Sequence, residues 1–216
     1  MPSHAHVATI LEKLQALYPE SVCALQFSSP LQLLVATILS AQCTDKRVNM
    51  VTPALFDAYP DAQALARAPV AAVEELVRST NFYRNKAKNI VAMADQLVRL
   101  HDGAVPRTLE ALVALPGVAR KTANVVLGVG FGLCEGIVVD THVRRVSGRL
   151  GLTTQTDPVK IERELMAVVP RSHWIALSHQ LIDHGRTVCT ARSPACSRCG
   201  LLSVCPTGKA REAAGA

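Results

Sequence analysis

The chain has 216 residues, of which 49% are hydrophobic and 19% charged, and its formal net charge is +6. This length and composition allow a well-packed core in one domain or two small ones, and they exclude a low-complexity chain. The whole charge excess lies in residues 120–216, where thirteen lysines and arginines outnumber seven acidic residues, whereas residues 1–119 carry ten of each. A basic half favours a polyanion-binding surface, although solvated helix faces would give the same count.

Apolar spacing and proline positions predict helices along nearly the whole chain. The charge-free stretch 24–44 is too rich in glutamine and serine to cross a membrane, and its leucines recur at helical spacing, so we expect a buried helix there. The one strand-like run, 137–139, is too short for a sheet, and the chain after Lys209 is expected to be a small polar tail. The predicted fold class is therefore all-α, with helices at 4–18, 30–42, 45–58, 70–78, 83–101, 108–114, 118–132, 141–150, 158–168 and 173–187.

Two of these helices are joined by the sequence LPGVARKTA at 115–123. Pro116-Gly117 predicts a tight turn, and the backbone N–H groups that open the next helix, together with Arg120, can hold a phosphate oxygen. An ordinary turn between packed helices would carry the same residues. Lys121 stands near that helix start, where the helix dipole and burial would lower its pKa and favour a nucleophilic amine. Its ammonium could instead reach solvent or phosphate.

A short apolar run at 136–139 ends in Asp140, directly before the helix that opens with Thr141 and His142. Aspartate at this place is a common helix N-cap. A carboxylate carried to a cleft by a buried segment can also act as a general base or stabilise developing charge. The pattern leaves both roles open, and it does not establish that Asp140 meets Lys121 in space.

Four of the seven cysteines fall close together near the C-terminus, spaced C-x6-C-x2-C-x5-C. Four thiolates in one short loop can converge on a metal centre with little loss of chain entropy. Structural zinc usually takes two C-x2-C pairs and only one is present, so the spacing favours an iron–sulfur cluster over zinc, while disulfides would need an oxidising compartment. The four are Cys189, Cys196, Cys199 and Cys205; the single cysteines Cys23, Cys43 and Cys134 are expected to be small buried hydrophobes.

Four separated segments occur in an order that resembles the endonuclease III branch of the helix-hairpin-helix DNA glycosylases. They are LLVATILSAQCTDKRVN, LPGVARKTANVV, VDTHVRRV and HGRTVCTARSPACSRCGLLSVCP. The resemblance runs from about residue 8 to about residue 208, and the combination of segments is specific to that family.

The resemblance implies two helical domains flanking a DNA-binding cleft. A six-helix barrel would span 23–134 and contain the helix-hairpin-helix motif at about 108–127. Residues 1–22 and 135–216 would form the iron–sulfur cluster domain, with the cluster loop at 189–205. The resemblance also implies a [4Fe–4S] cofactor held by Cys189, Cys196, Cys199 and Cys205.

The same resemblance assigns roles to single residues. The nucleophilic lysine of the family falls on Lys121 and its catalytic aspartate on Asp140. Gln42 matches the residue that fills the gap left by an extruded nucleotide, and Phe82 falls where the family carries an apolar wedge. Further contacts with DNA are expected from Leu115, Gly117, Ala119, Arg120 and His142.

The implied function is that of a bifunctional DNA glycosylase and AP lyase. Such an enzyme removes oxidised pyrimidines, of the thymine glycol and dihydrouracil type, through a lysine Schiff base and cuts the strand 3′ to the abasic site. An adenine mismatch glycosylase usually lacks the lysine, and a non-catalytic DNA-binding module or an electron carrier would leave the lysine or the hairpin unexplained. The expected partner is double-stranded DNA with damaged bases or abasic sites, bound by a monomer.

The N-terminal segment MPSHAHVATILEKLQ lacks the basic region, apolar core and cleavage site of a secretory signal. We therefore expect an intracellular protein of bacterial type, in the cytoplasm or nucleoid, with no membrane association.

Two positions depart from the family pattern. The hairpin has Ala119 where many relatives have a second glycine. Alanine at positive φ would cost about 1 kcal/mol, so we expect a negative φ there. The wedge segment has Asn81 where relatives often have glycine, and Phe82 is bulkier than the usual leucine. The depth of insertion into DNA is therefore expected to differ from that of most relatives.

Overall fold

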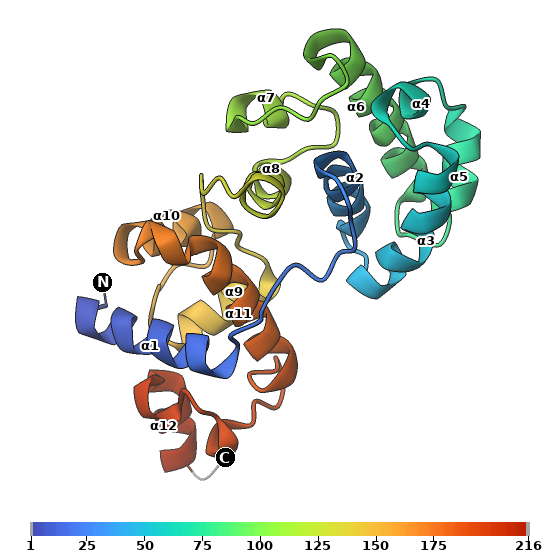
Figure 1. Ribbon diagram of the computed structural model, residues 1–216. Coiled ribbons are helices and arrows are strands. Elements are labelled where there is room, and N and C mark those ends of the chain that lie inside the picture. The colour runs from blue at the N-terminus through green and yellow to red at the C-terminus, as the bar shows by residue number, and fades with distance from the viewer. Residues whose placement is uncertain (1, 215–216) are drawn as a thin grey trace. The chain divides into compact units, whose positions relative to one another are not determined.

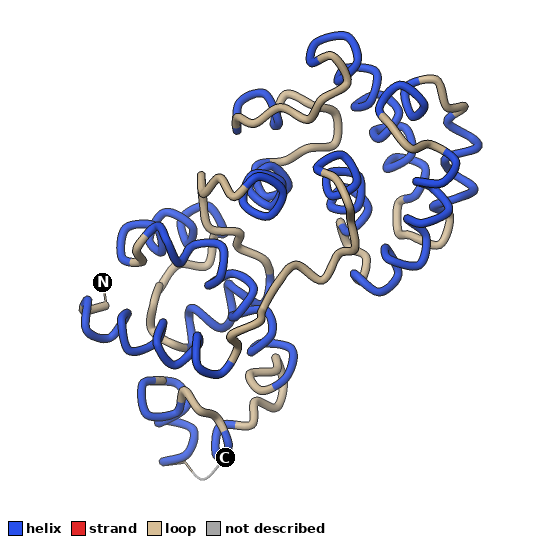
Figure 2. Tube along the Cα trace, in the orientation of Figure 1, coloured by secondary structure: helices blue, strands red, loops and turns tan. Residues whose placement is uncertain are grey.

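The computed structural model describes residues 2–214, and within them the chain forms helices and connecting loops but no β-strand (Figures 1 and 2). The all-α prediction is confirmed. The chain divides into two compact units, one made of residues 23–135 and the other of residues 1–22 with 136–216. Each unit has a hydrophobic core of its own. The assignment of a barrel domain and a cluster domain, with a boundary after residue 134, stays a prediction.

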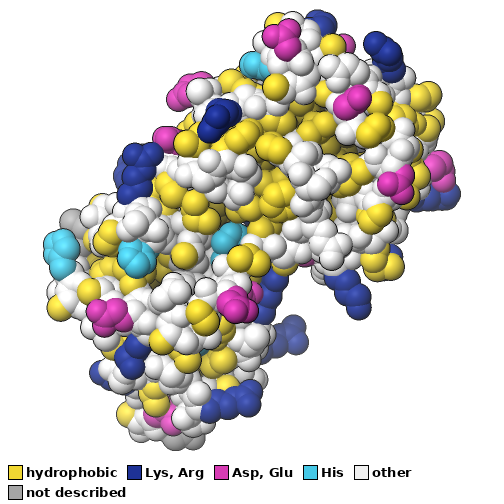
Figure 3. Space-filling view, in the orientation of Figure 1, with side chains coloured by type: hydrophobic (Ala, Val, Ile, Leu, Met, Phe, Trp, Pro, Cys, Tyr) yellow, Lys and Arg dark blue, Asp and Glu magenta, His cyan; other side chains and the backbone are white. Residues whose placement is uncertain are grey.

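The 23–135 unit is built around one buried helix. In α2 (Pro30–Ser40) every residue from Leu33 to Leu39 is buried, which confirms the buried helix expected in this charge-free stretch. Hydrophobic side chains also reach the surface of this unit, as Figure 3 shows. The helices of the unit are α2 (Pro30–Ser40), α3 (Asp45–Ala58), α4 (Ala62–Ala66), α5 (Val70–Val77), α6 (Tyr83–His101), α7 (Leu109–Val113) and α8 (Arg120–Val125), which continues as the π-helical turn η1 (Val126–Gly130).

The other unit joins the N-terminal helix to the C-terminal half of the chain. Val7, Ile10 and Leu14 of α1 enter the same core as the apolar side chains of α9, α10 and α11. A side-chain hydrogen bond of 2.9 Å between Gln15 and Gln180 also ties α1 to α11. The elements are α1 (His4–Leu17), α9 (Thr141–Arg149), α10 (Pro158–Val168), η2 (Arg171–His173), α11 (Trp174–Thr187), η3 (Cys196–Arg198), η4 (Leu202–Val204) and α12 (Pro206–Ala213), where the η elements of this unit are 3-10 turns.

Two helices were not predicted. The five-residue α4 is too short to show apolar periodicity, but Asp61 caps it by accepting a hydrogen bond from the Ala64 N–H at 2.7 Å. The small polar tail expected after Lys209 is helical through Ala213. Pro206 at the first position of α12 explains its start, because proline needs no hydrogen-bond partner there.

The three single cysteines are half-buried rather than buried. Cys23 and Cys43 pack at the edge of the 23–135 core. The expectation that the three are buried is therefore wrong, since Cys23, Cys43 and Cys134 all lie in links between helices and not inside helices.

Candidate active site and metal centre

A tight hairpin joins α7 to α8 in the 23–135 unit. The Val118 N–H donates to the carbonyl oxygen of Leu115 at 3.1 Å, which closes the turn around Gly117. Gly117 has a φ of +76°, and a Cβ at this position would lie 2.9 Å from the Cβ of Asn89. Only glycine fits both demands. Ala119 has a φ of −86°, which confirms the expected negative value.

The first turn of α8 presents its backbone N–H groups and two cations. Ala119 stands at the N-cap, and no side chain caps the helix there. The opening N–H groups of a helix lack intrahelical partners, so they remain available to an acceptor. Arg120 and Lys121 are both exposed, so the expected burial of the Lys121 side chain is wrong. Leu115 is only 2% exposed and can reach a partner through its backbone alone.

Asp140 stands at the N-cap of α9 in the other unit. Its Oδ1 accepts a hydrogen bond from the Val143 N–H at 2.7 Å, so the N-cap role is real. The apolar segment before it is anchored by Ile137 and Val139, which are both buried in the core. This local structure holds the half-buried carboxylate in one orientation. Lys121 belongs to the 23–135 unit, and the pairing of the two residues stays a prediction.

His142 lies two residues beyond Asp140 and is oriented by an arginine from the next turn of α9. The Nη2 of Arg145 lies 3.1 Å from Nδ1 of His142 and donates to the carbonyl oxygen of Gly185 at 2.9 Å. Because a guanidinium can only donate, Nδ1 is the acceptor, and the proton of a neutral His142 ring sits on Nε2. Arg145 also donates to the carbonyl oxygen of Cys189 at 3.1 Å, so it links this end of α9 to the cysteine loop.

Gln42 and Phe82 lie in two helix links of the 23–135 unit, and both side chains are exposed. The structure brings these links together. The Nδ2 of Asn81 donates to the carbonyl oxygen of Gln42 at 2.6 Å.

The four C-terminal cysteines line one cavity together with Arg149 and His184. Within residues 2–214 no three His, Cys, Asp or Glu side chains form a group that could hold one metal ion. The four thiols instead surround a shared space, which suits a centre larger than a single ion. Burial raises the pKa of the Cys199 and Cys205 thiols, and the neighbouring cysteines act in the same direction. These thiols must lose their protons to bind iron.

Hydrogen-bond donors point at the sulfur atoms around this cavity. Nη1 of Arg149 lies 3.3 Å from Sγ of Cys189, and the backbone N–H of Gly208 lies 3.2 Å from Sγ of Cys205. Such donors suit thiolates that accept hydrogen bonds while they bind iron. The residues present therefore fit an iron–sulfur cluster.

His184 is a further neighbour of the cavity that the sequence did not single out. It is 2% exposed, and burial lowers its pKa to about 4. Its Nε2 lies 3.6 Å from Sγ of Cys199, and its Nδ1 lies 2.9 Å from the Tyr18 hydroxyl. Tyr18 is 166 residues away along the chain, so no local spacing could have revealed this contact.

Comparisons with known proteins agree with this geometry. Residues 35–171 match the HhH-GPD superfamily base excision DNA repair protein family, and residues 189–205 match the iron–sulfur binding domain of endonuclease III. The endonuclease III of Synechocystis sp. is 56% identical over 93% of this chain and 92% of its own length. The chain belongs to the endonuclease III family.

Other members of the endonuclease III family are similar over nearly their full length. The Bacillus subtilis enzyme is 45% identical, with 95% of this chain and 94% of its own covered. A solved non-covalent endonuclease III–DNA complex is 41% identical, has a TM-score of 0.92 and covers 99% of this chain and all of the other. A trapped endonuclease III–DNA covalent intermediate, the estranged-adenine complex, has a TM-score of 0.91 at the same identity and covers 98% of this chain and 100% of its own.

Membership of the endonuclease III family decides the class of activity and the cofactor. The protein is a bifunctional DNA glycosylase and AP lyase of base excision repair. The match at 189–205 implies a [4Fe–4S] cluster. This resolves the choice between zinc and iron–sulfur that the cysteine spacing left open. None of the helices within residues 2–214 is both long and apolar enough to span a membrane.

Proposed function

We propose that this member of the endonuclease III family removes oxidised pyrimidines, of the thymine glycol and dihydrouracil type, from duplex DNA and cleaves the strand 3′ to the resulting abasic site. The observation that carries the proposal is the exposed amine of Lys121 on the first turn of α8, directly after the hairpin. A relative that is 41% identical has been trapped as a covalent intermediate with DNA, which supports a covalent mechanism.

Lys121 is the nucleophile of the proposed reaction. Its neutral amine attacks C1′ of the damaged nucleotide, and the C1′–N bond to the base breaks as the base leaves with that electron pair and takes up a proton. The sugar ring then opens, and the amine nitrogen forms a C1′=N imine with loss of a proton. Removal of a C2′ proton sends electrons into the C2′–C3′ bond and expels the 3′ phosphate. Hydrolysis of the imine releases the lysine.

Asp140 stabilises the positive charge that develops on the sugar and moves protons around the lysine amine. Its half-buried carboxylate is held by the Val143 N–H, which supports a fixed orientation toward substrate. His142 follows on the same helix, with its Nε2 proton free to donate because Arg145 occupies Nδ1. We assign His142 to contact with the extruded nucleotide.

The hairpin binds the DNA backbone without reading sequence. The exposed N-terminal turn of α8, with Gly117, Ala119 and Arg120, supports contact with phosphate oxygens, and Leu115 contributes through its backbone. Gln42 fills the gap that the extruded nucleotide leaves, and Phe82 wedges beside it. A damaged base costs less to extrude than a normal one because its stacking or pairing is already weak.

The four thiolates of Cys189, Cys196, Cys199 and Cys205 are the proposed ligands of the [4Fe–4S] cluster. The cluster supplies metal–thiolate bonds that order a loop with few buried apolar residues. The loop presents the exposed Arg192 and Arg198 to the DNA backbone. We further propose that the protein acts as a monomer. We also propose that it works in the cytoplasm or nucleoid of a bacterium, because its curated relatives are bacterial and its charge excess suits contact with DNA.

Borohydride trapping tests the proposed function. A duplex with one thymine glycol is incubated with the parent protein, with Lys121→Gln and with Lys160→Gln, which removes an exposed lysine of the other unit. The parent and Lys160→Gln are expected to form a covalent adduct with DNA, and Lys121→Gln is expected to form none.

Two other results would change the proposed nucleophile or the proposed substrate. Base release without trapping would mean that Lys121 is not the nucleophile. A duplex with adenine opposite 8-oxoguanine serves as the second substrate, and base release from it alone would replace oxidised pyrimidines with a mismatch substrate.

A further inference from the structure

Two links in the 23–135 unit hold non-glycine residues in the left-handed backbone region. Gln42 has a φ of +51° in the link between α2 and α3, and Phe82 has a φ of +55° in the link between α5 and α6. Within residues 2–214 the only other non-glycine residue with positive φ is Asp102, at the end of α6. Each such residue costs about 1 kcal/mol or more, so the surrounding structure must enforce it.

The two links are fastened to each other by side chains of the second link and the helix that follows it. Asn81, next to Phe82, donates from Nδ2 to the carbonyl oxygen of Gln42 at 2.6 Å. Lys86, one turn into α6, donates from Nζ to the carbonyl oxygen of Leu39 at 2.7 Å. Lys86 is only 5% exposed, and its hydrogen bond lies in the interior of the unit.

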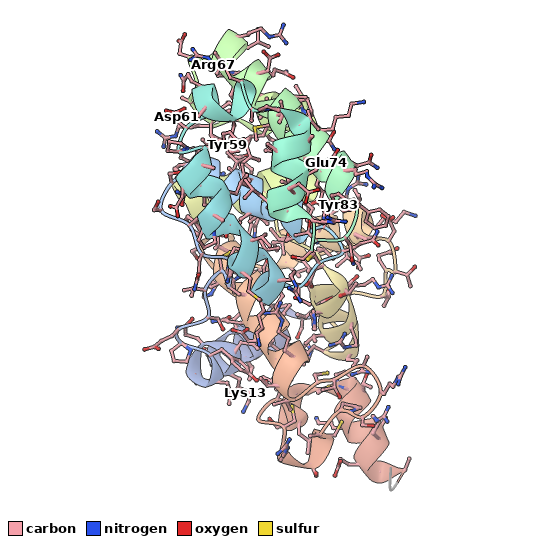
Figure 4. The ribbon with its side chains drawn as sticks, turned by 90° about the vertical axis from the view of Figure 1, so that its right-hand side faces the viewer. Lys13, Tyr59, Asp61, Arg67, Glu74 and Tyr83 are labelled. Atoms are coloured by element: carbon pink, nitrogen blue, oxygen red, sulfur yellow. The ribbon has the colours of Figure 1, made fainter. Side chains whose placement is uncertain are left out.

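The link between α5 and α6 is also anchored to the helices on either side of it. Thr80 is 2% exposed, and its hydroxyl donates to the carbonyl oxygen of Val77 at the end of α5. The Lys86 N–H donates to the carbonyl oxygen of Phe82 and so starts α6, whose first residue, Tyr83, is labelled in Figure 4. The exposed Gln42 and Phe82 therefore follow helices, α2 and α5, whose last turns hold the buried residues Leu39 and Val77.

We propose that Asn81 is a positioning residue that holds Gln42 and Phe82 as one preorganised pair before DNA arrives. This inference rests on the proposed function, in which Gln42 fills the gap left by an extruded nucleotide and Phe82 wedges beside it. Asn81 does not enter the reaction and acts through the backbone of Gln42. Without it the two links must become ordered separately when DNA binds, and that ordering reduces the free energy available for extrusion.

Asparagine suits this place because of its side-chain amide. Its side-chain amide supplies a donor that reaches across to the neighbouring link, and a glycine would have no side chain to do so. Lys86 makes a similar connection in the interior of the unit, by donating a hydrogen bond to a carbonyl oxygen near the end of α2. The Asn81 hydrogen bond thus fixes the position of the Gln42 link, which backbone flexibility would otherwise leave variable.

The test compares Asn81→Ala with Asn85→Ala, a matched variant of an exposed asparagine on the first turn of α6. Single-turnover base release is measured on a duplex with one thymine glycol, and strand cleavage is measured on a single-stranded oligonucleotide with one abasic site. Asn81→Ala is expected to slow base release from the duplex by about five-fold, which corresponds to the loss of one ordinary hydrogen bond. It is expected to leave single-strand cleavage unchanged, because a single strand has no gap to fill.

Gln42→Ala and Phe82→Ala are run beside these variants. If both slow base release while Asn81→Ala matches Asn85→Ala, the positioning role is wrong and the proposed insertion stands. If neither slows base release while Lys121→Gln still abolishes trapping, the insertion role is wrong and the positioning role falls with it. An equal loss by Asn81→Ala on duplex and single strand would overturn the inference as well, because a general structural defect affects both substrates.

Discussion

At the scale of single residues, positions that we propose for the chemistry also satisfy local demands of the backbone. Asp140 caps α9 through the Val143 N–H, and Gly117 is the residue that the hairpin can accommodate beside Asn89. A structural role alone would therefore account for either residue. Substitutions that remove one role and retain the other are needed to separate them.

Asp140 can be separated from its capping role by comparing asparagine with alanine. Asparagine caps a helix about as well as aspartate but carries no charge, so Asp140→Asn is expected to keep the melting temperature and to slow base release by roughly 100-fold or more. Asp140→Ala is expected to lose about 1 kcal/mol of stability in addition, or about 2–4 °C.

The control for Asp140 is Asp157, which caps α10 in the same unit by accepting from the Lys160 N–H at 3.0 Å. Asp157→Ala should show a similar loss of melting temperature with full base release. Full activity in Asp140→Asn would show that Asp140 is a cap and nothing more.

Gly117 and Gly132 form a matched pair in the 23–135 unit. Both have positive φ, +76° and +68°, but a Cβ at Gly132 meets no atom within 4 Å, whereas one at Gly117 meets Asn89. Gly132→Ala is expected to cost about 1 kcal/mol, the penalty of the backbone conformation alone. Gly117→Ala should lower the melting temperature further and also weaken binding to duplex DNA. Equal losses in the two variants would mean that the contact with Asn89 relaxes at no cost.

At the scale of elements, α9 connects the candidate active site to the cysteine loop. Asp140 lies at its start, and Arg145 and Arg149 project from successive turns of one side toward the loop that follows α11. Arg149 donates to Sγ of Cys189 and to the carbonyl oxygens of residues 190 and 191 at 2.7 and 2.9 Å. The helix thereby holds Cys189, the first of the proposed cluster ligands, and the backbone on its C-terminal side.

Loss of Arg149 should make the cluster more sensitive to oxidation while α9 stays folded. In Arg149→Met the loop loses the charged donor to Sγ of Cys189 and to the carbonyl oxygens that follow it, so the visible absorbance of the cluster is expected to decay several-fold faster under an oxidant than in the parent. Arg144→Met is the control, because Arg144 is exposed on the same helix. Equal decay rates for the two variants would show that the hydrogen bonds of Arg149 do not protect the cluster.

At the scale of the whole molecule, the chain builds two cores from three segments. The 23–135 unit is one continuous segment, whereas the other unit needs both ends of the chain. Its core includes Val7, Ile10 and Leu14 of α1 beside side chains from 137 to 205. The two units therefore differ in how they depend on the rest of the chain.

Fragments of the protein should reflect this difference. Residues 23–135 expressed alone are expected to be helical by circular dichroism and to melt cooperatively, because their core is complete. Residues 136–216 alone lack the α1 side chains of their core and are expected to melt without cooperativity until a peptide of residues 1–22 is added. A 23–135 fragment without a cooperative melt would show that this unit depends on the other.

Features that depend on neighbouring residues could be predicted from the sequence. Helix bounds at 45–58, 83–101 and 158–168 are confirmed residue for residue, because apolar spacing, caps and prolines act within one or two turns. The hairpin around Gly117 and the cysteine loop are equally local, which is why their motifs pointed to the family, and the family implies the cofactor. The short α4 was not predicted, because five residues are too few to show a helical period of apolar side chains.

Features that depend on contacts across the chain were decided by the tertiary structure alone. Lys121 was expected to be buried and is exposed, because its surroundings depend on how α8 packs and not on its apolar neighbours in sequence. The link from Asn81 to Gln42 spans 39 residues, and that from Tyr18 to His184 spans 166. The sequence by itself predicted which residues carry the chemistry, since those patterns are short. Only folding decided the contacts of Gln42 and His184, because their partners come from distant segments.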